Sequence, residues 1–157
     1  MTHAALESDI CDIVVDEVFP HAPQALWHAL TTADLMGRWL MVPKGFAPQV
    51  GRRFTYQTTP AGAWDGVIQC EVLEVTPFSR FAYSWKGGHP ANTGYGSPLD
   101  TVVTFLIDPT EAGSRLRLVH SGFVLPTNRS AYEKMSDGWK GVVKTVGAIA
   151  SEGSDGA

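Results

Sequence analysis

Histidine, tyrosine and carboxylate side chains are the groups of this chain that could take part in acid–base chemistry. His120 falls on the same face of a strand-like segment as Leu116 and Leu118. A neutral imidazole near Tyr83 or Asp65 could act as a general acid or base around neutral pH. The alternative is a core histidine that is hydrogen-bonded to the backbone or to a tyrosine, and we favour this alternative.

Established catalytic and metal-binding patterns are absent from the sequence. The five histidines are scattered, and no His-x-His, His-x-x-x-His or metal-spaced cysteine pair occurs. There is no Gly-x-Ser-x-Gly elbow, phosphate loop or dinucleotide-binding fingerprint. Glu71 and Glu74 lie on opposite faces of their segment, so they form no catalytic carboxylate pair. We therefore expect no metal and no cofactor, while the question of enzymatic activity stays open.

Aromatic residues form the largest set of candidate binding residues, with five Trp, four Tyr and seven Phe. Because side chains alternate between the faces of a strand, several of these rings are expected to point inward. They could line a ligand cavity with apolar walls, or they could fill a core. The candidate lining is Trp39, Tyr56, Trp64, Tyr83, Trp85, Phe105, Leu118, His120, Met135 and Trp139.

The elements that would position these residues are mostly short strands. Runs rich in β-branched and aromatic residues, several with strict alternation, predict six of them. The predicted strands cover 10–19, 51–58, 66–76, 80–86, 99–108 and 114–123.

Three helices complete the prediction. Two short ones follow the first strand, one opened by Pro23 and one over about 32–38 with Thr32 as its N-cap. A long helix over about 130–149 is predicted from apolar residues that recur at three- and four-residue steps. A capping-box spacing at Ser130 marks its beginning.

The order of these elements predicts an α+β architecture. Consecutive strands with short connections form an antiparallel sheet, and its apolar face needs a cover. The terminal helix is the only element long enough, so we expect a curved sheet around it with a space between. A seventh strand could lie within 40–50, and the Gly- and Pro-rich loop 87–98 is expected to be functional or mobile. Glycines 138, 141 and 147 in the helix would permit close approach of another group.

Length and composition are typical of one globular domain, expected over 10–150 with flexible termini at 1–9 and 151–157. The chain has 157 residues, of which 44% are hydrophobic, enough for a sizeable core. A net charge of −4 gives no basic footprint for nucleic acid, and no apolar run is long enough for a membrane span. With no evident secretory signal, and with Cys11 and Cys70 interpreted as buried thiols, we expect a cytoplasmic protein.

Several motifs together resemble the START-like (SRPBCC, helix-grip) superfamily and, within it, the activator of heat-shock protein 90 ATPase homologue family. They span about 10–149 and include ALWHALTT followed by LMGRWL, WDGVIQCEVLEV with RFAYSW, LRLVHSGF, and DGWKGVV. The resemblance implies a sheet gripping a long C-terminal helix around a cavity, which favours a binding role for the aromatic set. Because the superfamily includes lipid carriers, cyclases and co-chaperone domains, the fold alone does not identify the function.

Three functions are consistent with these patterns. The preferred one is a binding protein that holds a small apolar or aromatic molecule between the sheet and the terminal helix, without covalent chemistry. The second is a cyclase- or dehydratase-type enzyme in which His120 or Tyr83 acts as acid or base. The third, implied by the resemblance, is a domain that interacts with a chaperone ATPase. Val102 and Val119, expected on the outer face of the sheet, could mark a homodimer contact.

Overall fold

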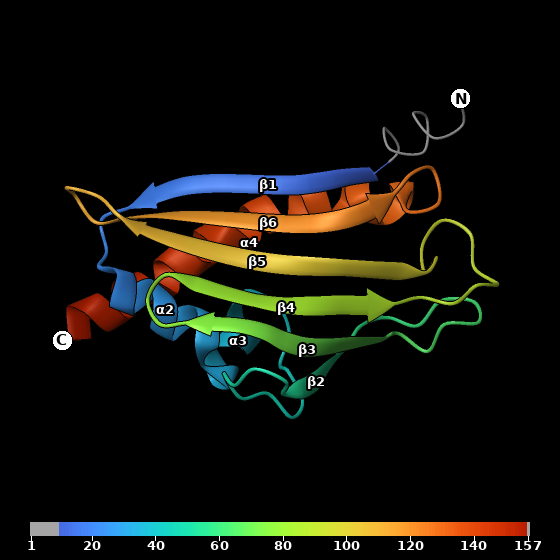
Figure 1. Ribbon diagram of the computed structural model, residues 1–157, viewed down its shortest axis with the longest axis horizontal. Helices are drawn as coiled ribbons and strands as arrows, with labels where there is room; N and C mark the ends of the chain where they lie inside the picture. Colours follow the sequence, from blue (N-terminus) through green and yellow to red (C-terminus); the bar gives the residue numbers. More distant parts are fainter. Residues whose placement is uncertain (1–9, 157) are drawn as a thin grey trace.

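The computed structural model describes the backbone of residues 10–156 and the side chains of residues 10–152. The N-terminal segment 1–9, expected to be flexible, lies outside the described residues. All the predicted strands and helices are present (Figure 1). In chain order they are β1 (Ile10–Phe19), α2 (Pro23–Thr31), α3 (Ala33–Trp39), β2 (Arg53–Gln57), β3 (Val67–Thr76), β4 (Arg80–Gly87), β5 (Leu99–Pro109), β6 (Ser114–Val124) and α4 (Arg129–Gly156).

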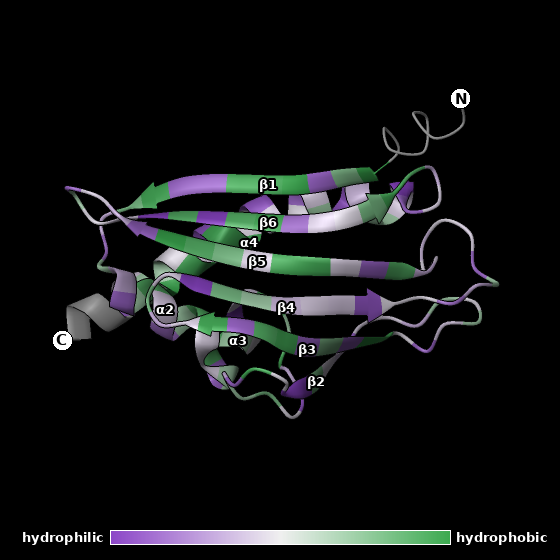
Figure 2. Cartoon of the chain, viewed as in Figure 1, coloured by the Kyte–Doolittle hydropathy of each residue, from purple (hydrophilic) through white to green (hydrophobic). Residues whose placement is uncertain are grey.

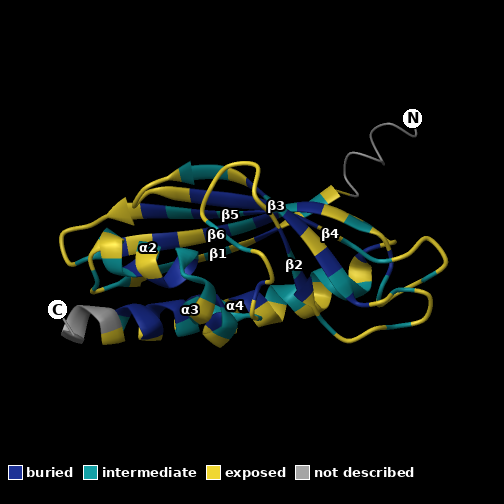
Figure 3. Cartoon of the chain, turned by 90° about the horizontal axis from the view of Figure 1, so that it is seen from below, coloured by how far each residue is buried: buried dark blue, intermediate teal, exposed yellow. Residues whose placement is uncertain are grey.

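The six strands form one antiparallel sheet in the order β1-β6-β5-β4-β3-β2. Helix α4 runs along one face of this sheet, and α2 and α3 lie on the same side near one end (Figures 1 and 3). This arrangement confirms the predicted α+β, helix-grip-like fold. Within 40–50, where a seventh strand could lie, the chain forms no strand, and Lys44 makes a single antiparallel bridge to Thr55.

Alternating side chains on the strands build the core. On β4, Phe81, Tyr83 and Trp85 are all buried on the face toward α4. On β6 the same face carries Leu118 and His120, which are fully buried. Because adjacent residues of a strand point to opposite faces, this period-two pattern gives the sheet one apolar face, which α4 covers.

The outer face of the sheet has no helix over it among the described residues and carries a charged cluster. Asp16 accepts two hydrogen bonds from Arg115, at 2.7 and 2.5 Å, and one from Arg117 at 3.4 Å. The Arg115 guanidinium thereby lowers the pKa of the Asp16 carboxyl. Hydrophobic bands alternate with hydrophilic ones along β1 in Figure 2, and Val14 and Val18 are among its exposed apolar residues.

Helix α4 begins without the predicted capping box. Neither Ser130 nor Glu133 forms a capping hydrogen bond within the described residues, and Glu133 instead pairs with Arg129 at 3.8 Å. The helix starts one residue earlier than predicted, and the side chain of Asn128 reaches back to accept a hydrogen bond from the Val124 N–H at 2.9 Å. Asn128 also bonds to Ser97 and to the Pro98 carbonyl, so tertiary contacts hold the chain at the start of α4.

The end of α4 also differs from the prediction, because the helix continues from 149 to Gly156 through most of the segment 151–157 expected to be a flexible tail. Arg38 donates two hydrogen bonds to Glu152, at 2.9 and 2.6 Å, and so ties the added turn to α3. Two parallel hydrogen bonds between a guanidinium and a carboxylate fix the geometry of the pair, so they help to hold the C-terminal end of α4 in place.

Two smaller expectations also need correction. The Thr32 hydroxyl donates to the His28 carbonyl at 2.7 Å and makes no cap bond to α3. Thr32 is the only residue between α2 and α3, and its hydroxyl bonds back to α2. Of the two cysteines, Cys70 is buried and Cys11 is only half-buried. Burial raises the pKa of the Cys70 thiol to about 12.

The three helix glycines have different surroundings. A Cβ on Gly147 would overlap the ring of Phe19, so this glycine permits close packing of β1 on α4. A Cβ on Gly138 or Gly141 would meet nothing within 4 Å. Close approach therefore explains Gly147 alone.

Candidate ligand-binding site

His120 lies in the core, with both ring nitrogens hydrogen-bonded. Its Nδ1 accepts from the Trp139 indole N–H at 3.0 Å, and its Nε2 lies 2.8 Å from the Thr101 hydroxyl. Since that hydroxyl donates its hydrogen to the Trp85 carbonyl at 2.8 Å, Nε2 carries the proton and Thr101 accepts it. Burial lowers the pKa of His120 to about 3, so the ring is neutral and fully used by the core.

Tyr83 is equally enclosed. Its hydroxyl lies 3.3 Å from the hydroxyl of Tyr56, and both rings are buried. Burial raises the pKa of both tyrosines above their usual value. Neither hydroxyl lies on a cavity wall, because the two share their hydrogen bond inside packed aromatic residues.

Six of the ten residues predicted to line a cavity thus form a packed core. Trp39 stands edge-on to Phe105 with ring centroids 5.7 Å apart, and its indole N–H donates to the Ala29 carbonyl at 2.9 Å. The polar tips of the Trp39, Tyr56, Tyr83 and His120 side chains all find partners within the chain. The six are Trp39, Tyr56, Tyr83, Phe105, Leu118 and His120.

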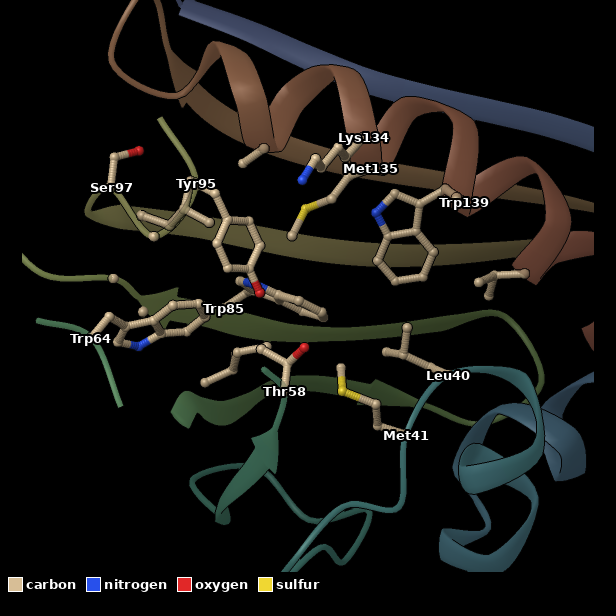
Figure 4. Close-up of a pocket in the computed structure, with 18 residues that line it drawn as sticks. Leu40, Met41, Thr58, Trp64, Trp85, Tyr95, Ser97, Lys134, Met135 and Trp139 are labelled. Carbon is tan, nitrogen blue, oxygen red and sulfur yellow. The ribbon is translucent and has the colours of Figure 1, made fainter. Parts of the chain in front are cut away.

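The other four predicted residues lie on the wall of a cavity of about 240 Å³ (Figure 4). The cavity lies between β4, the loops before β3 and β5, and the first turns of α4. Its wall is mostly aromatic and aliphatic. The four predicted residues are Trp64, Trp85, Met135 and Trp139, and the other main wall residues are Leu40, Met41, Thr58, Ile68, Tyr95, Ser97, Leu99, Ala131, Lys134, Gly138 and Val142.

The loop 87–98, expected to be functional or mobile, supplies one wall of the cavity and is bound to the loop before β3. Asn92 accepts a hydrogen bond from the Ala63 N–H at 3.0 Å and donates to the Ala61 carbonyl at 2.6 Å. A Cβ on Gly62 or Gly96 would overlap Asn92, so both glycines leave room for this link. The two loops therefore form one connected wall.

A second amide connects the same loop to the beginning of α4. Asn128, 3% exposed, donates to the Pro98 carbonyl at 2.7 Å and to the Ser97 hydroxyl at 3.3 Å. The Ser97 hydroxyl in turn donates to the Thr127 carbonyl at 2.9 Å. Because buried polar groups are costly to leave unpaired, this network holds the wall of the cavity in place.

The polar groups on the wall are few. Lys134 is the only charged residue among the lining residues, and its ammonium lies 4.8 Å from the centre of the Tyr95 ring. The Tyr95 hydroxyl donates to the Thr59 carbonyl at 3.1 Å, and the Trp64 indole N–H donates to the Val67 carbonyl at 3.1 Å. Lys134 and Tyr95 are exposed, so the cavity opens to solvent beside them.

Several wall residues gave no usable sequence signal. Met41, Thr58 and Tyr95 lie in connections, where neither a period of 2 nor one of 3.6 indicates which side chain points inward. Lys134 lies on the predicted terminal helix, but a charge there is usually solvated. Asp65, considered as a partner for His120, is exposed and caps its own turn by accepting from the Val67 N–H at 2.9 Å.

Metal-ligand clusters and membrane-spanning helices are both missing from the described residues. Among the described residues, no group of three or more His, Cys, Asp and Glu side chains is arranged to hold a metal ion. None of the helices in this part of the chain combines the length and the apolar character needed to cross a membrane.

Comparisons with known structures agree with the fold described above. Protein MLL2253 from Mesorhizobium loti is 35% identical, with a TM-score of 0.78 over 90% of this chain and 98% of that one. Two more distant structures show the fold alone. CalU16 from Micromonospora echinospora is 21% identical, with a TM-score of 0.67 over 90% of this chain and 77% of that one. The Aha1 dimer from Colwellia psychrerythraea is 18% identical, with a TM-score of 0.65 over 87% of this chain and 92% of that one.

The comparison with curated proteins gives no match. A family model described as "Activator of Hsp90 ATPase homolog 1-like protein" matches residues 20–149, most of the chain and nearly all of the described fold. The chain therefore belongs to the Activator of Hsp90 ATPase homolog 1-like family.

Proposed function

We propose that this protein binds a small, largely apolar molecule in the cavity between β4, loop 87–98 and α4. The observation that carries the proposal is the 240 Å³ space lined by aromatic and aliphatic side chains. An engineered apolar cavity of about 150 Å³ holds benzene, which has six non-hydrogen atoms. At the same volume per atom, this cavity has room for about ten non-hydrogen atoms. The ligand would contact Trp64, Trp85, Met135 and Trp139.

The hydrogen bonds of the loops support a site formed before the ligand arrives. Asn92 and Asn128 bind loop 87–98 to the loop before β3 and to the start of α4. A wall that is already ordered loses little conformational entropy on binding, so more of the contact energy appears as affinity.

The environment of the two candidate acid–base residues favours binding over cyclase- or dehydratase-type chemistry. His120 uses both nitrogens within the core, and the hydroxyl of Tyr83 is shared with that of Tyr56. Neither residue lines the cavity. A proton-transfer group must come within hydrogen-bond reach of the reacting atom, and these two groups do not reach the cavity.

Filling the cavity tests the proposal. Gly138 lines the cavity and Gly141 does not, while a Cβ at either position meets nothing within 4 Å. Thermal shift and titration calorimetry with 3-phenylpropanoic acid and with 3-phenylpropan-1-ol should detect binding of at least one to the wild-type protein, since a ligand specific for the native state raises stability. We expect Gly138→Leu to abolish that binding and Gly141→Leu to retain it. Equal binding by both variants, or no binding of either compound, would contradict the proposal.

A second candidate function is contact with an Hsp90 ATPase, supported by the family match over residues 20–149. Such a role would agree with the cytoplasmic location, which stays a prediction. Co-sedimentation with purified Hsp90 and its ATPase rate should then both respond to the protein. An unchanged ATPase rate together with no co-sedimentation would exclude this role.

Self-association is a further expectation. Val102 and Val119 are half-buried, whereas Val14 and Val18 on the outer face of β1 are 59% and 57% exposed. The related Colwellia psychrerythraea protein is described as a dimer. If two copies of this chain meet along β1, sedimentation should give a dimer for the wild type and a monomer for Val14→Lys. A wild-type monomer at all concentrations would remove this expectation.

A further inference from the structure

One nearly buried polar atom on the cavity wall lacks a partner. Trp85 is 3% exposed, and its indole nitrogen makes no hydrogen bond to any residue in the described part of the chain. In the described part of the chain, every side-chain nitrogen or oxygen that is fully buried has a hydrogen-bond partner. Since the Trp85 N–H has none, it is not fully buried and is accessible. Because the ring lines the cavity, that access comes from the cavity, where the N–H is free to donate.

The other tryptophans of the region do not share this property. The Trp139 N–H is used by His120, and the Trp64 N–H by the Val67 carbonyl. Trp39 donates to the Ala29 carbonyl. An unused donor at Trp85 is therefore a feature of the cavity and not of buried tryptophans in general, since a buried N–H usually finds a partner.

A positive charge stands on the same wall. The ammonium of Lys134 lies over the Tyr95 ring, and no ion pair is formed by Lys134 within the described residues. In Figure 4 the ammonium and the hydroxyl of Thr58 point toward the same space from opposite sides. No carboxylate is among the lining residues, so the only fixed charge that a bound molecule would meet is positive.

We propose that the ligand is a compact carboxylic acid whose carboxylate binds near Lys134 and the Trp85 N–H while its apolar body packs against Met135, Trp139 and Leu40. This inference rests on the proposed function and adds the chemical class of the ligand. A carboxylate offers acceptors to both donors, and hydrogen bonds to an ionised acceptor are stronger than those to a neutral one. An apolar ligand would leave the Trp85 donor unpaired, and a cationic ligand would be repelled by Lys134.

A matched pair of probes tests the charge. 3-Phenylpropanoic acid and 3-phenylpropan-1-ol share one apolar body and differ in the anionic group. At pH 7 and low ionic strength, calorimetry should give an affinity for the acid about tenfold higher than for the alcohol. We expect Lys134→Met to lower the affinity for the acid about tenfold and to leave that for the alcohol unchanged. Lys140→Met is the control, because Lys140 is exposed on the same helix and does not line the cavity.

The outcomes separate the two proposals. Equal affinity for acid and alcohol in the wild type, or an equal loss of both in Lys134→Met, overturns the carboxylate assignment and leaves the binding function in place. Binding of neither probe overturns the binding function itself. Loss of acid affinity in Lys140→Met as well would show that the general charge of α4 is responsible, which also overturns the assignment. Lys134 is exposed, so its replacement should not prevent folding, and thermal unfolding of each variant checks this.

Discussion

Aromatic and polar residues between the sheet and α4 are used differently in two regions. In the packed core, the tips of the side chains bond to one another or to the backbone, as in the Tyr56–Tyr83 pair and the Trp39 contact with the Ala29 carbonyl. Near loop 87–98, a glycine stands at 138 on the wall, and the Trp85 N–H has no partner among the described residues. In the first region the polar groups are paired within the chain. The second region contains empty space and an indole N–H that is free to donate.

The difference shows that residue type alone does not distinguish a packed core from the wall of a cavity. Trp39 and Trp85 are both almost fully buried tryptophans with aromatic neighbours. They differ in whether the indole N–H is already bonded. The unmade hydrogen bond of Trp85, and not its aromatic ring, is therefore what separates the proposed site from the core.

The largest effect that tests this comparison is on stability. Phe105 is fully buried in the packed region, and Phe105→Ala should cost about 3–5 kcal/mol of unfolding free energy, because it opens a new cavity. Met135 already borders empty space, so Met135→Ala should cost only about 1 kcal/mol. Urea unfolding measures both. Similar losses would mean that the two regions are packed alike, against the division described above.

The next effect concerns pH. The folded-state pKa of His120 is lowered to about 3 by burial, from a usual value of 6.5. Below pH 6.5 the unfolded chain takes up a proton at this residue and the folded chain does not. His120 therefore destabilises the fold progressively as pH falls from 6.5 to about 3, at about 1.4 kcal/mol per pH unit. By pH 5 this amounts to about 2 kcal/mol.

His120→Gln removes this titration. We expect the unfolding free energy of the variant to be lower than that of the wild type at pH 7, since the bonds to Thr101 and Trp139 are disturbed. Between pH 6.5 and 4, the unfolding free energy of the variant should fall less steeply than that of the wild type, by about 1.4 kcal/mol per pH unit. Parallel curves for the two proteins would show that His120 titrates in the fold and is not sealed in the core.

The sequence predicted the fold well because the strands obey a simple rule. In Phe81, Tyr83 and Trp85 the spacing of two places each ring on the face toward α4, as the structure confirms. The capping box at Ser130 failed because Asn128 bonds to Ser97 and Pro98, about thirty residues earlier in the chain. Such a contact depends on how loops meet in space, which no local pattern reveals.

The cavity was harder to place for the same reason. Ten residues were predicted to line it, and periodicity could show only that they face inward. Which of them border empty space depends on what stands opposite. The indole of Trp139 reaches into the core to His120, whereas Gly138, one residue earlier, leaves its side of the space open. Tyr95 and Met41 lie in connections, so their inward position depends on the bonds of Asn92 and on the turn after α3.

The smallest effect concerns the glycines of α4. Replacing them shows which of these glycines the fold needs, at the packed Phe19 contact or on the cavity wall. Gly147→Ala should destabilise the protein by about 1–3 kcal/mol, because the new methyl group overlaps the Phe19 ring. Gly138→Ala should stabilise it by about 1 kcal/mol, since alanine is the better helix former and no atom lies within 4 Å of the new Cβ.

Thermal and urea unfolding of both variants give the signs directly. If Gly138→Ala is stabilising, the backbone does not require glycine at 138, as the division between a packed core and an open cavity wall expects. Gly141→Ala supplies the control, because Gly141 has the same open surroundings away from the cavity and should give the same gain. A loss of stability at 138 and a gain at 141 would mean that Gly138 serves the backbone, and the contrast between the two regions would then rest on the tryptophan donors alone.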